Sequence, residues 1–166
     1  MKKGLPTWAI IVGIIVVVVG FFLSTHNRLV KGNEEVDNQW AQVESQYQRR
    51  FDLIPNLVES VKGAMSQEEE VFSKIADART RYSSAQTSSE KAEAATEVES
   101  ALSRLLVVIE NYPELKSLDT VKTLMSQLEG TENRIAVERQ RYNDQVKAFN
   151  SDVKTIPTKW IASMFG

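Results

Sequence analysis

The chain has 166 residues, which is enough for one folded domain and a membrane anchor but too few for two domains and an anchor. Its 20 Lys and Arg nearly balance its 22 Asp and Glu, and no basic block occurs, which argues against nucleic acid as a partner. The sequence holds no cysteine, so disulfides, zinc–thiolate sites and thiol nucleophiles are excluded.

An apolar run from Leu5 to Leu23 contains no charged residue. As a helix it would span about 28 Å, close to the roughly 30 Å of a bilayer's hydrocarbon core. Trp8 lies near one end, where an indole ring suits the membrane interface. A cleaved signal peptide is the alternative, but the run is longer than a usual signal core and no A-x-A motif follows it. We therefore predict a single-pass anchor in the lipid bilayer at residues 5–23.

The orientation of this anchor depends on the basic residues beside it. Lys2 and Lys3 precede the run together with the amino terminus, and Arg28 and Lys31 follow it, so the tally is nearly tied. The tight N-terminal pair favours a short N-terminus in the cytoplasm and a domain outside it.

The first soluble segment is amphipathic. Its apolar positions recur at steps of three and four, which predicts one helical face: Val36, Trp40, Val43, Tyr47, Phe51 and Ile54. Pro55 has no N–H to donate and fits poorly in mid-helix, while Asp52 could cap a new helix. We predict a break near residues 50–54, with a kinked continuous helix as the alternative.

A second helical pattern covers residues 57–82 and ends in a Ser-rich loop at residues 83–89. Thr87 and Glu90 then form a capping-box signature for a third helix. Pro113 ends that helix.

The fourth pattern follows a short turn at residues 114–117 and runs from Leu118 to about Thr155. Gly130 in its middle disfavours the helix by about 1 kcal/mol relative to Ala, so we expect either a close neighbouring helix or a bend there. Few Gly and Pro and no alternating pattern indicate an all-α fold. Four amphipathic segments with short connections predict an antiparallel four-helix bundle behind the transmembrane helix.

These patterns divide the chain into an anchor segment at 1–25, a helical bundle at 26–156 and an apolar tail at 157–166. If the helices alternate in direction, the tail returns toward the membrane, where it is either an interfacial amphipathic segment or a cap on the bundle core. The candidate membrane-surface residues are Trp8, Trp160, Ile161 and Phe165.

Residues that could support catalysis are sparse. The single histidine, His26, lies at the end of the apolar run and is best interpreted as an interface residue. The sequence has no Glu-x-x-His motif for a di-iron site and no Gly-rich phosphate loop. We therefore predict no catalytic, metal-binding or cofactor-binding residue, no cofactor, and a protein that is not an enzyme.

Several polar residues lie among the helical faces instead. They either cap helices and fix the register of the bundle through buried hydrogen bonds, or form a surface that binds a partner. These residues are Arg49, Arg50, Asp52, Asn56, Asn133 and Arg134.

The stretch from His26 to Gly63 closely resembles the N-terminal signature of the LemA family of bacterial membrane proteins, above all in RRFDLIPNLV at residues 49–58. NYPELK at 111–116 is similar to the family's central turn, and LEGTENRI at 128–135 to its C-terminal signature. The resemblance covers about residues 26–160.

This resemblance implies an anchored four-helix bundle in the bacterial cell envelope, and it carries no catalytic residue onto this chain. We expect a membrane-anchored helical scaffold or adaptor that binds other envelope proteins, with self-assembly into a homo-oligomer as a further option. The alternative is a module that binds lipid or the membrane surface through the tail.

Overall fold

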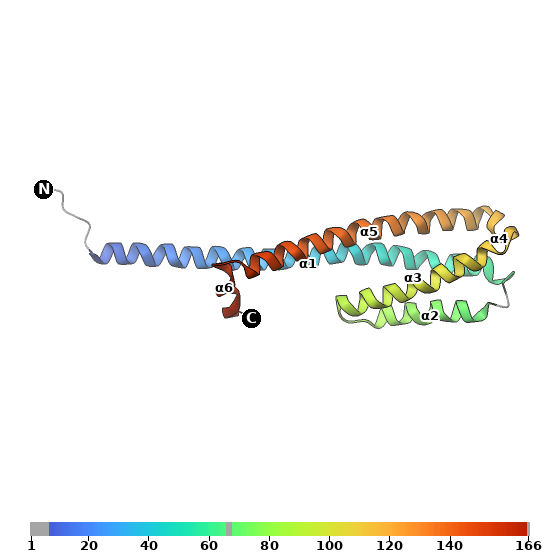
Figure 1. Ribbon diagram of the computed structural model, residues 1–166, viewed down its shortest axis with the longest axis horizontal. Helices are drawn as coiled ribbons and strands as arrows, with labels where there is room; N and C mark the ends of the chain where they lie inside the picture. The colour runs from blue at the N-terminus through green and yellow to red at the C-terminus, as the bar shows by residue number, and fades with distance from the viewer. Residues whose placement is uncertain (1–6, 66–67, 166) are drawn as a thin grey trace. The chain divides into compact units, whose positions relative to one another are not determined.

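A computed structural model describes residues 7–65 and 68–165 (Figure 1). Within those ranges every regular element is a helix, which confirms the all-α prediction. The helices are α1 (Thr7–Lys62), α2 (Glu69–Ser84), α3 (Ser88–Glu110), α4 (Pro113–Ser117), α5 (Asp119–Lys154) and α6 (Thr158–Phe165).

Helix α1 contains the apolar run from Thr7 to Leu23, and the first two residues of the run lie outside the described residues. Of the helices in the described part of the chain, it is the one that is long and apolar enough to cross a membrane. Only 6% of its most apolar window is buried, whereas the core helix of a soluble protein would be mostly buried. Length, composition and exposure are therefore all consistent with a membrane-spanning helix.

The predicted break before Pro55 is wrong, because α1 continues through this residue to Lys62. Pro55 is exposed, but Ile54 and Leu57 on either side of it are fully buried. We attribute the continuity to this burial, which outweighs the backbone hydrogen bond that Pro55 cannot donate to the Phe51 carbonyl.

The chain turns later, after Gly63, so the predicted helix over residues 57–82 is divided between the end of α1 and α2. The carbonyl of Val61 accepts hydrogen bonds from the amides of Ala64 and Met65, both at 3.1 Å. Met65 is fully buried, so this turn is packed against the protein.

The connection between α2 and α3 confirms the predicted capping box. Thr87 Oγ1 accepts from the Glu90 amide at 3.2 Å, and the Glu90 carboxylate accepts from the Thr87 amide at 3.0 Å. The Glu90 carboxylate also accepts from the Gln86 amide, and these backbone N–H groups lower the pKa of Glu90. The loop itself is shorter than predicted, since α2 ends at Ser84 and α3 begins at Ser88.

The segment after α3 differs slightly from the prediction. Residues 114–117 are not a plain turn but part of the short helix α4, which has Pro113 in its first turn. Helix α5 then covers nearly the range predicted for the fourth helix.

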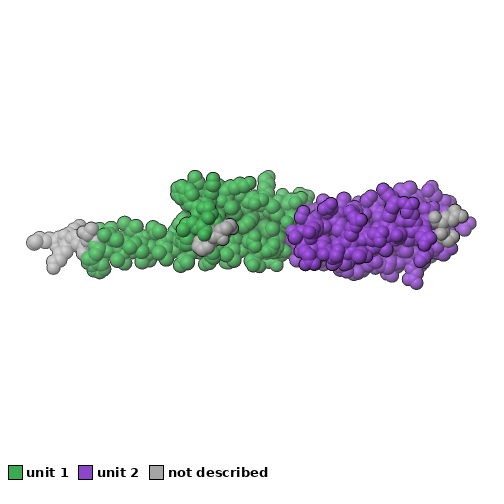
Figure 2. Space-filling model, turned by 90° about the horizontal axis from the view of Figure 1, so that it is seen from below, with its two compact units in different colours: residues 1–39, 140–166 green, residues 40–139 purple. Residues whose placement is uncertain are grey.

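The structure divides into two compact units, residues 1–39 with 140–166 (unit 1) and residues 40–139 (unit 2) (Figure 2). In unit 2, α2 and α3 pack on each other (Figure 1). The four longer helical segments of unit 2 each contribute buried apolar side chains: Val43, Tyr47, Phe51, Ile54, Leu57 and Val61 of α1; Ile75, Ala78 and Tyr82 of α2; Val98, Leu102, Leu105 and Ile109 of α3; and Val121, Leu124, Leu128 and Ile135 of α5.

Two glycines have different surroundings. A Cβ atom built on Gly130 would meet nothing within 4 Å, so the expected close neighbour at this position is absent, and α5 runs through it unbroken. A Cβ atom on Gly32 would lie 2.8 Å from Cδ2 of Phe149. In unit 1, Gly32 therefore lets the Phe149 ring of α5 approach the backbone of α1.

Substituting these two glycines should have opposite effects. Gly130→Ala should raise the free energy of unfolding by about 0.5–1 kcal/mol, because alanine favours the helix and has space for its methyl group. Gly32→Ala should lower it, since overpacking of about 1–3 kcal/mol exceeds the gain in helix propensity. Thermal unfolding of the full chain in detergent, followed by circular dichroism, measures both; equal shifts for the two variants would contradict this account.

Candidate functional site

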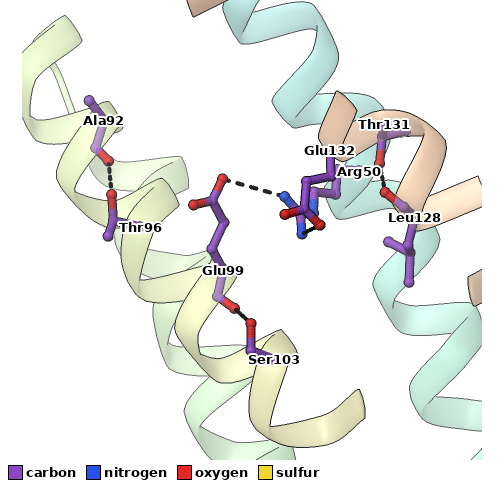
Figure 3. A network of polar contacts seen from close by, with 8 residues as sticks. All are labelled: Arg50, Ala92, Thr96, Glu99, Ser103, Leu128, Thr131 and Glu132. Atoms are coloured by element: carbon purple, nitrogen blue, oxygen red, sulfur yellow. Dashed lines mark hydrogen bonds and ion pairs between the residues drawn. The ribbon is translucent and has the colours of Figure 1, made fainter. Parts of the chain in front are cut away.

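Among the predicted polar residues, Arg50 has the most distinctive environment. It is 4% exposed and lies in unit 2. Its Nη1 is 3.4 Å from Oε1 of Glu99 on α3, and its Nη2 is 3.5 Å from Oε2 of Glu132 on α5 (Figure 3). One side chain of α1 thus connects to two other helices through paired charges.

The charges in this network are unequally buried. The side chain of Glu99 is 28% exposed and that of Glu132 is 67% exposed, so both carboxylates keep some contact with water. The guanidinium does not, and its Nε has no hydrogen-bond partner in the structure. The two carboxylates therefore compensate a buried cation, at distances near the upper limit for hydrogen bonds.

A cluster of aromatic rings also lies in unit 2. The ring centroids of Phe51 and Tyr82 are 4.6 Å apart in an edge-to-face contact, and Tyr47 lies about equally far from both, at 5.9 and 6.0 Å. The Tyr82 hydroxyl is buried without a hydrogen-bond partner, and its burial raises its pKa, with a smaller contribution from Glu44. A phenol with a raised pKa stays neutral at physiological pH, which suits packing rather than proton transfer.

Three of the predicted residues lie together on the outside of α1. Arg49, Asp52 and Asn56 are all exposed, and their spacing of three and four places them on one stripe of the helix. The Oδ1 of Asp52 accepts a hydrogen bond from Nε2 of Gln48 at 2.9 Å. This stripe, which also borders the exposed Pro55, is a polar surface with acidic, basic and amide groups.

The other two predicted residues lie on α5. Asn133 and Arg134 are exposed and directly follow Glu132. Because Glu132 pairs with Arg50, this part of α5 lies beside the part of α1 around Arg50. Arg50 alone among the six is buried, and whether the five exposed residues bind a partner stays a prediction.

The candidate membrane-surface residues fall into two groups. Trp8 is exposed within the apolar part of α1. Trp160 is exposed on α6, whereas Ile161 beside it is 6% exposed and packs against the protein. The side chain of Phe165 lies outside the described residues.

Arg28, one of the basic residues that follow the apolar run, makes long-range contacts within unit 1. Its Nη2 donates to Thr158 Oγ1 of α6 at 2.9 Å, and its Nε lies 3.5 Å from Oδ2 of Asp152 on α5. These partners lie more than a hundred positions away in the sequence, so no local pattern could reveal them.

Comparison with known proteins agrees with the motifs. A family model described as "LemA family" matches residues 39–166. The chain belongs to the LemA family. It is similar to the magnetosome proteins MamQ 1 and MamQ 2 of Paramagnetospirillum magneticum, each 27% identical over 190 residues, which is 97% of this chain and 70% of the relative. It is also similar to Protein LemA of Metamycoplasma hominis, at 23% identity over 170 residues, which is 98% of this LemA-family chain and 78% of the relative.

The two adjacent arginines allow a matched test of the buried network. Arg50→Ala should lower the free energy of unfolding by about 1–3 kcal/mol, because it empties a buried site, while the carboxylates that lose the cation are partly exposed. Arg49→Ala should change it by no more than about 0.5 kcal/mol, because that side chain is exposed. Chemical denaturation of the full chain measures both. Similar values for the two variants would show that the pairing of Arg50 contributes little.

Proposed function

We propose that this LemA-family protein is a non-enzymatic, membrane-anchored helical adaptor or scaffold that binds other envelope proteins. Its binding module is an antiparallel four-helix bundle, and its anchor is the apolar part of α1. Residues from four helical segments share the buried core of unit 2, which supports the bundle. The observation that carries the proposal is the exposed polar stripe of Arg49, Asp52 and Asn56 on the helix that also contains the apolar run.

The chemistry of the described residues supports a binding role over a catalytic one. In the ranges 7–65 and 68–165 no group of three or more His, Cys, Asp or Glu residues could hold a metal ion. Among the described residues, the most buried charged group is that of Arg50, which is committed to two intramolecular ion pairs. Exposed polar groups of mixed charge suit recognition of another protein surface.

We further propose that the protein is a single-pass protein of the bacterial cell membrane, with its bundle outside the cytoplasm. Membership of the LemA family and the exposed apolar run of α1 support the membrane location. Relatives named as magnetosome proteins support a role within a larger cellular structure, and self-assembly into a homo-oligomer is one form that this role can take.

A photocrosslinking amino acid at position 52 of the full chain, expressed in the native bacterium, tests the adaptor role. We expect discrete crosslinked species that mass spectrometry identifies as envelope proteins or as a second copy of the chain. Combining Arg49→Ala and Asn56→Ala with this label should reduce the yield at least severalfold, because the label keeps its position while the stripe loses its polar groups.

The matched control uses three exposed residues of α3 with the same spacing, Glu93, Thr96 and Ser100. With the label at position 96, alanine at positions 93 and 100 should not produce the severalfold fall in crosslinking yield that is expected for α1. Crosslinks that are absent at position 52, or unaffected by the two α1 substitutions, would contradict an adaptor that works through this stripe.

The orientation can be measured separately. Alkaline phosphatase is active only outside the cytoplasm, so a fusion after Gly166 should be active, whereas a fluorescent protein that folds only inside should stay dark at the same point. The reverse pattern would place the bundle in the cytoplasm and leave the adaptor role to be tested there.

A further inference from the structure

The last helix, α6, exposes large apolar side chains. Trp160 is 64% exposed and Met164 is 72% exposed, and a separation of four positions places them on one face of the helix. Ile156, just before α6, is also exposed. Single exposed apolar residues are ordinary, but an eight-residue helix with an indole and a thioether on its outer face is typical of a surface that is covered in use.

A neighbouring face of α6 is fixed to α1 within unit 1. Thr158 and Ile161 of α6 are buried. Arg28 holds this end of the chain, through its hydrogen bond to Thr158 and its ion pair with Asp152. The exposed face of α6 is therefore presented by a helix whose other face is already packed.

The position of Arg28 along α1 determines the level of α6 relative to the bilayer. Arg28 follows Leu23, the last residue of the apolar run, by five positions, or about 8 Å along the helix axis. The headgroup layer on each side of a bilayer is about 5–8 Å thick. With residues 5–23 in the hydrocarbon core, α6 lies at the level of the lipid headgroups.

The charge of the segment matches that environment. Residues 153–166 contain Lys154 and Lys159 and no acidic residue, and both lysines are exposed. Basic residues beside an apolar helix face favour binding to anionic lipids at the membrane interface.

We propose that α6 is an interfacial helix, which buries Trp160 and Met164 among the headgroups of the bilayer that α1 crosses and binds anionic lipid phosphates through Lys154 and Lys159. This inference rests on the proposed membrane span of α1 and adds a second membrane contact to it. Because α6 is attached to one side of α1 at Arg28, binding at the surface limits rotation of the spanning helix about its own axis.

The chain contains three tryptophans, at positions 8, 40 and 160, which allow a direct test. Three variants of the full chain each keep one of them and carry phenylalanine at the other two. They are reconstituted in vesicles of phosphatidylcholine and phosphatidylglycerol whose acyl chains are brominated, since bromine quenches tryptophan on contact. We expect quenching of Trp8 and Trp160, strongest for Trp160 when the bromines are close to the glycerol backbone, and none of Trp40 in unit 2.

The three variants separate failure of this inference from failure of the proposed span. Quenched Trp8 with unquenched Trp160 would overturn the interfacial helix and leave the span intact. Unquenched Trp8 would overturn the span itself, and the inference with it.

Two further measurements address charge and folding. Lys154→Gln with Lys159→Gln should weaken the quenching of Trp160 in vesicles with phosphatidylglycerol but not in pure phosphatidylcholine; no difference would overturn the part assigned to anionic lipid. In the chain with all three tryptophans, Met164→Cys labelled with a polarity-sensitive dye should shift to the blue on reconstitution, whereas Ser100→Cys on α3 should not. Equal shifts would overturn the inference independently of the tryptophan variants.

Discussion

A guanidinium that is almost completely buried must find its counter-charges within the protein, and Arg50 finds them on two other helices. Glu99 reaches it from α3 and Glu132 from α5 (Figure 3). Apolar side chains tolerate sliding of one helix along another, because their attraction has no direction. A buried ion pair does not tolerate such sliding, since a shift of one helical turn would leave the cation without a partner. We interpret Arg50 as the residue that sets the register of three helices in unit 2.

The parts of the fold that were predicted correctly rest on local signals. The capping box of Thr87 and Glu90 needs only neighbouring residues, so the start of α3 could be placed from the sequence. The bounds of α5 could also be predicted from the sequence, because a helical apolar pattern there ends just before Pro157. In both cases the sequence within a few turns determines the structure.

The wrong predictions lie where packing against residues far away in the sequence determines the local structure. A proline inside a helix is a strong local argument for a break, but the burial of Ile54 and Leu57 against other helices keeps α1 continuous at Pro55. At Gly130 the sequence allowed either a close neighbouring helix or a bend, and the structure shows no close neighbour there.

The candidate site shows the same division. Arg49, Asp52 and Asn56 were selected from the sequence as polar candidates, but their common face depends on the continuity of α1 through Pro55, which was not predicted. That Arg50 points inward, one position along, depends on carboxylates 49 and 82 positions away. The contact of Arg28 with Thr158 spans 130 positions and had no counterpart in any motif.

The contact between Arg28 and Thr158 also sets the position of α6 relative to the apolar run. The helical residues between Leu23 and Arg28 separate the apolar run from the attachment point of α6, and each of them contributes about 1.5 Å of rise and 100° of turn. Inserting one residue there would lift α6 only slightly but would carry it more than a quarter of the way around α1. The length of this short spacer therefore determines which side of the apolar helix faces the C-terminal segment, although none of its residues needs a special side chain to do so.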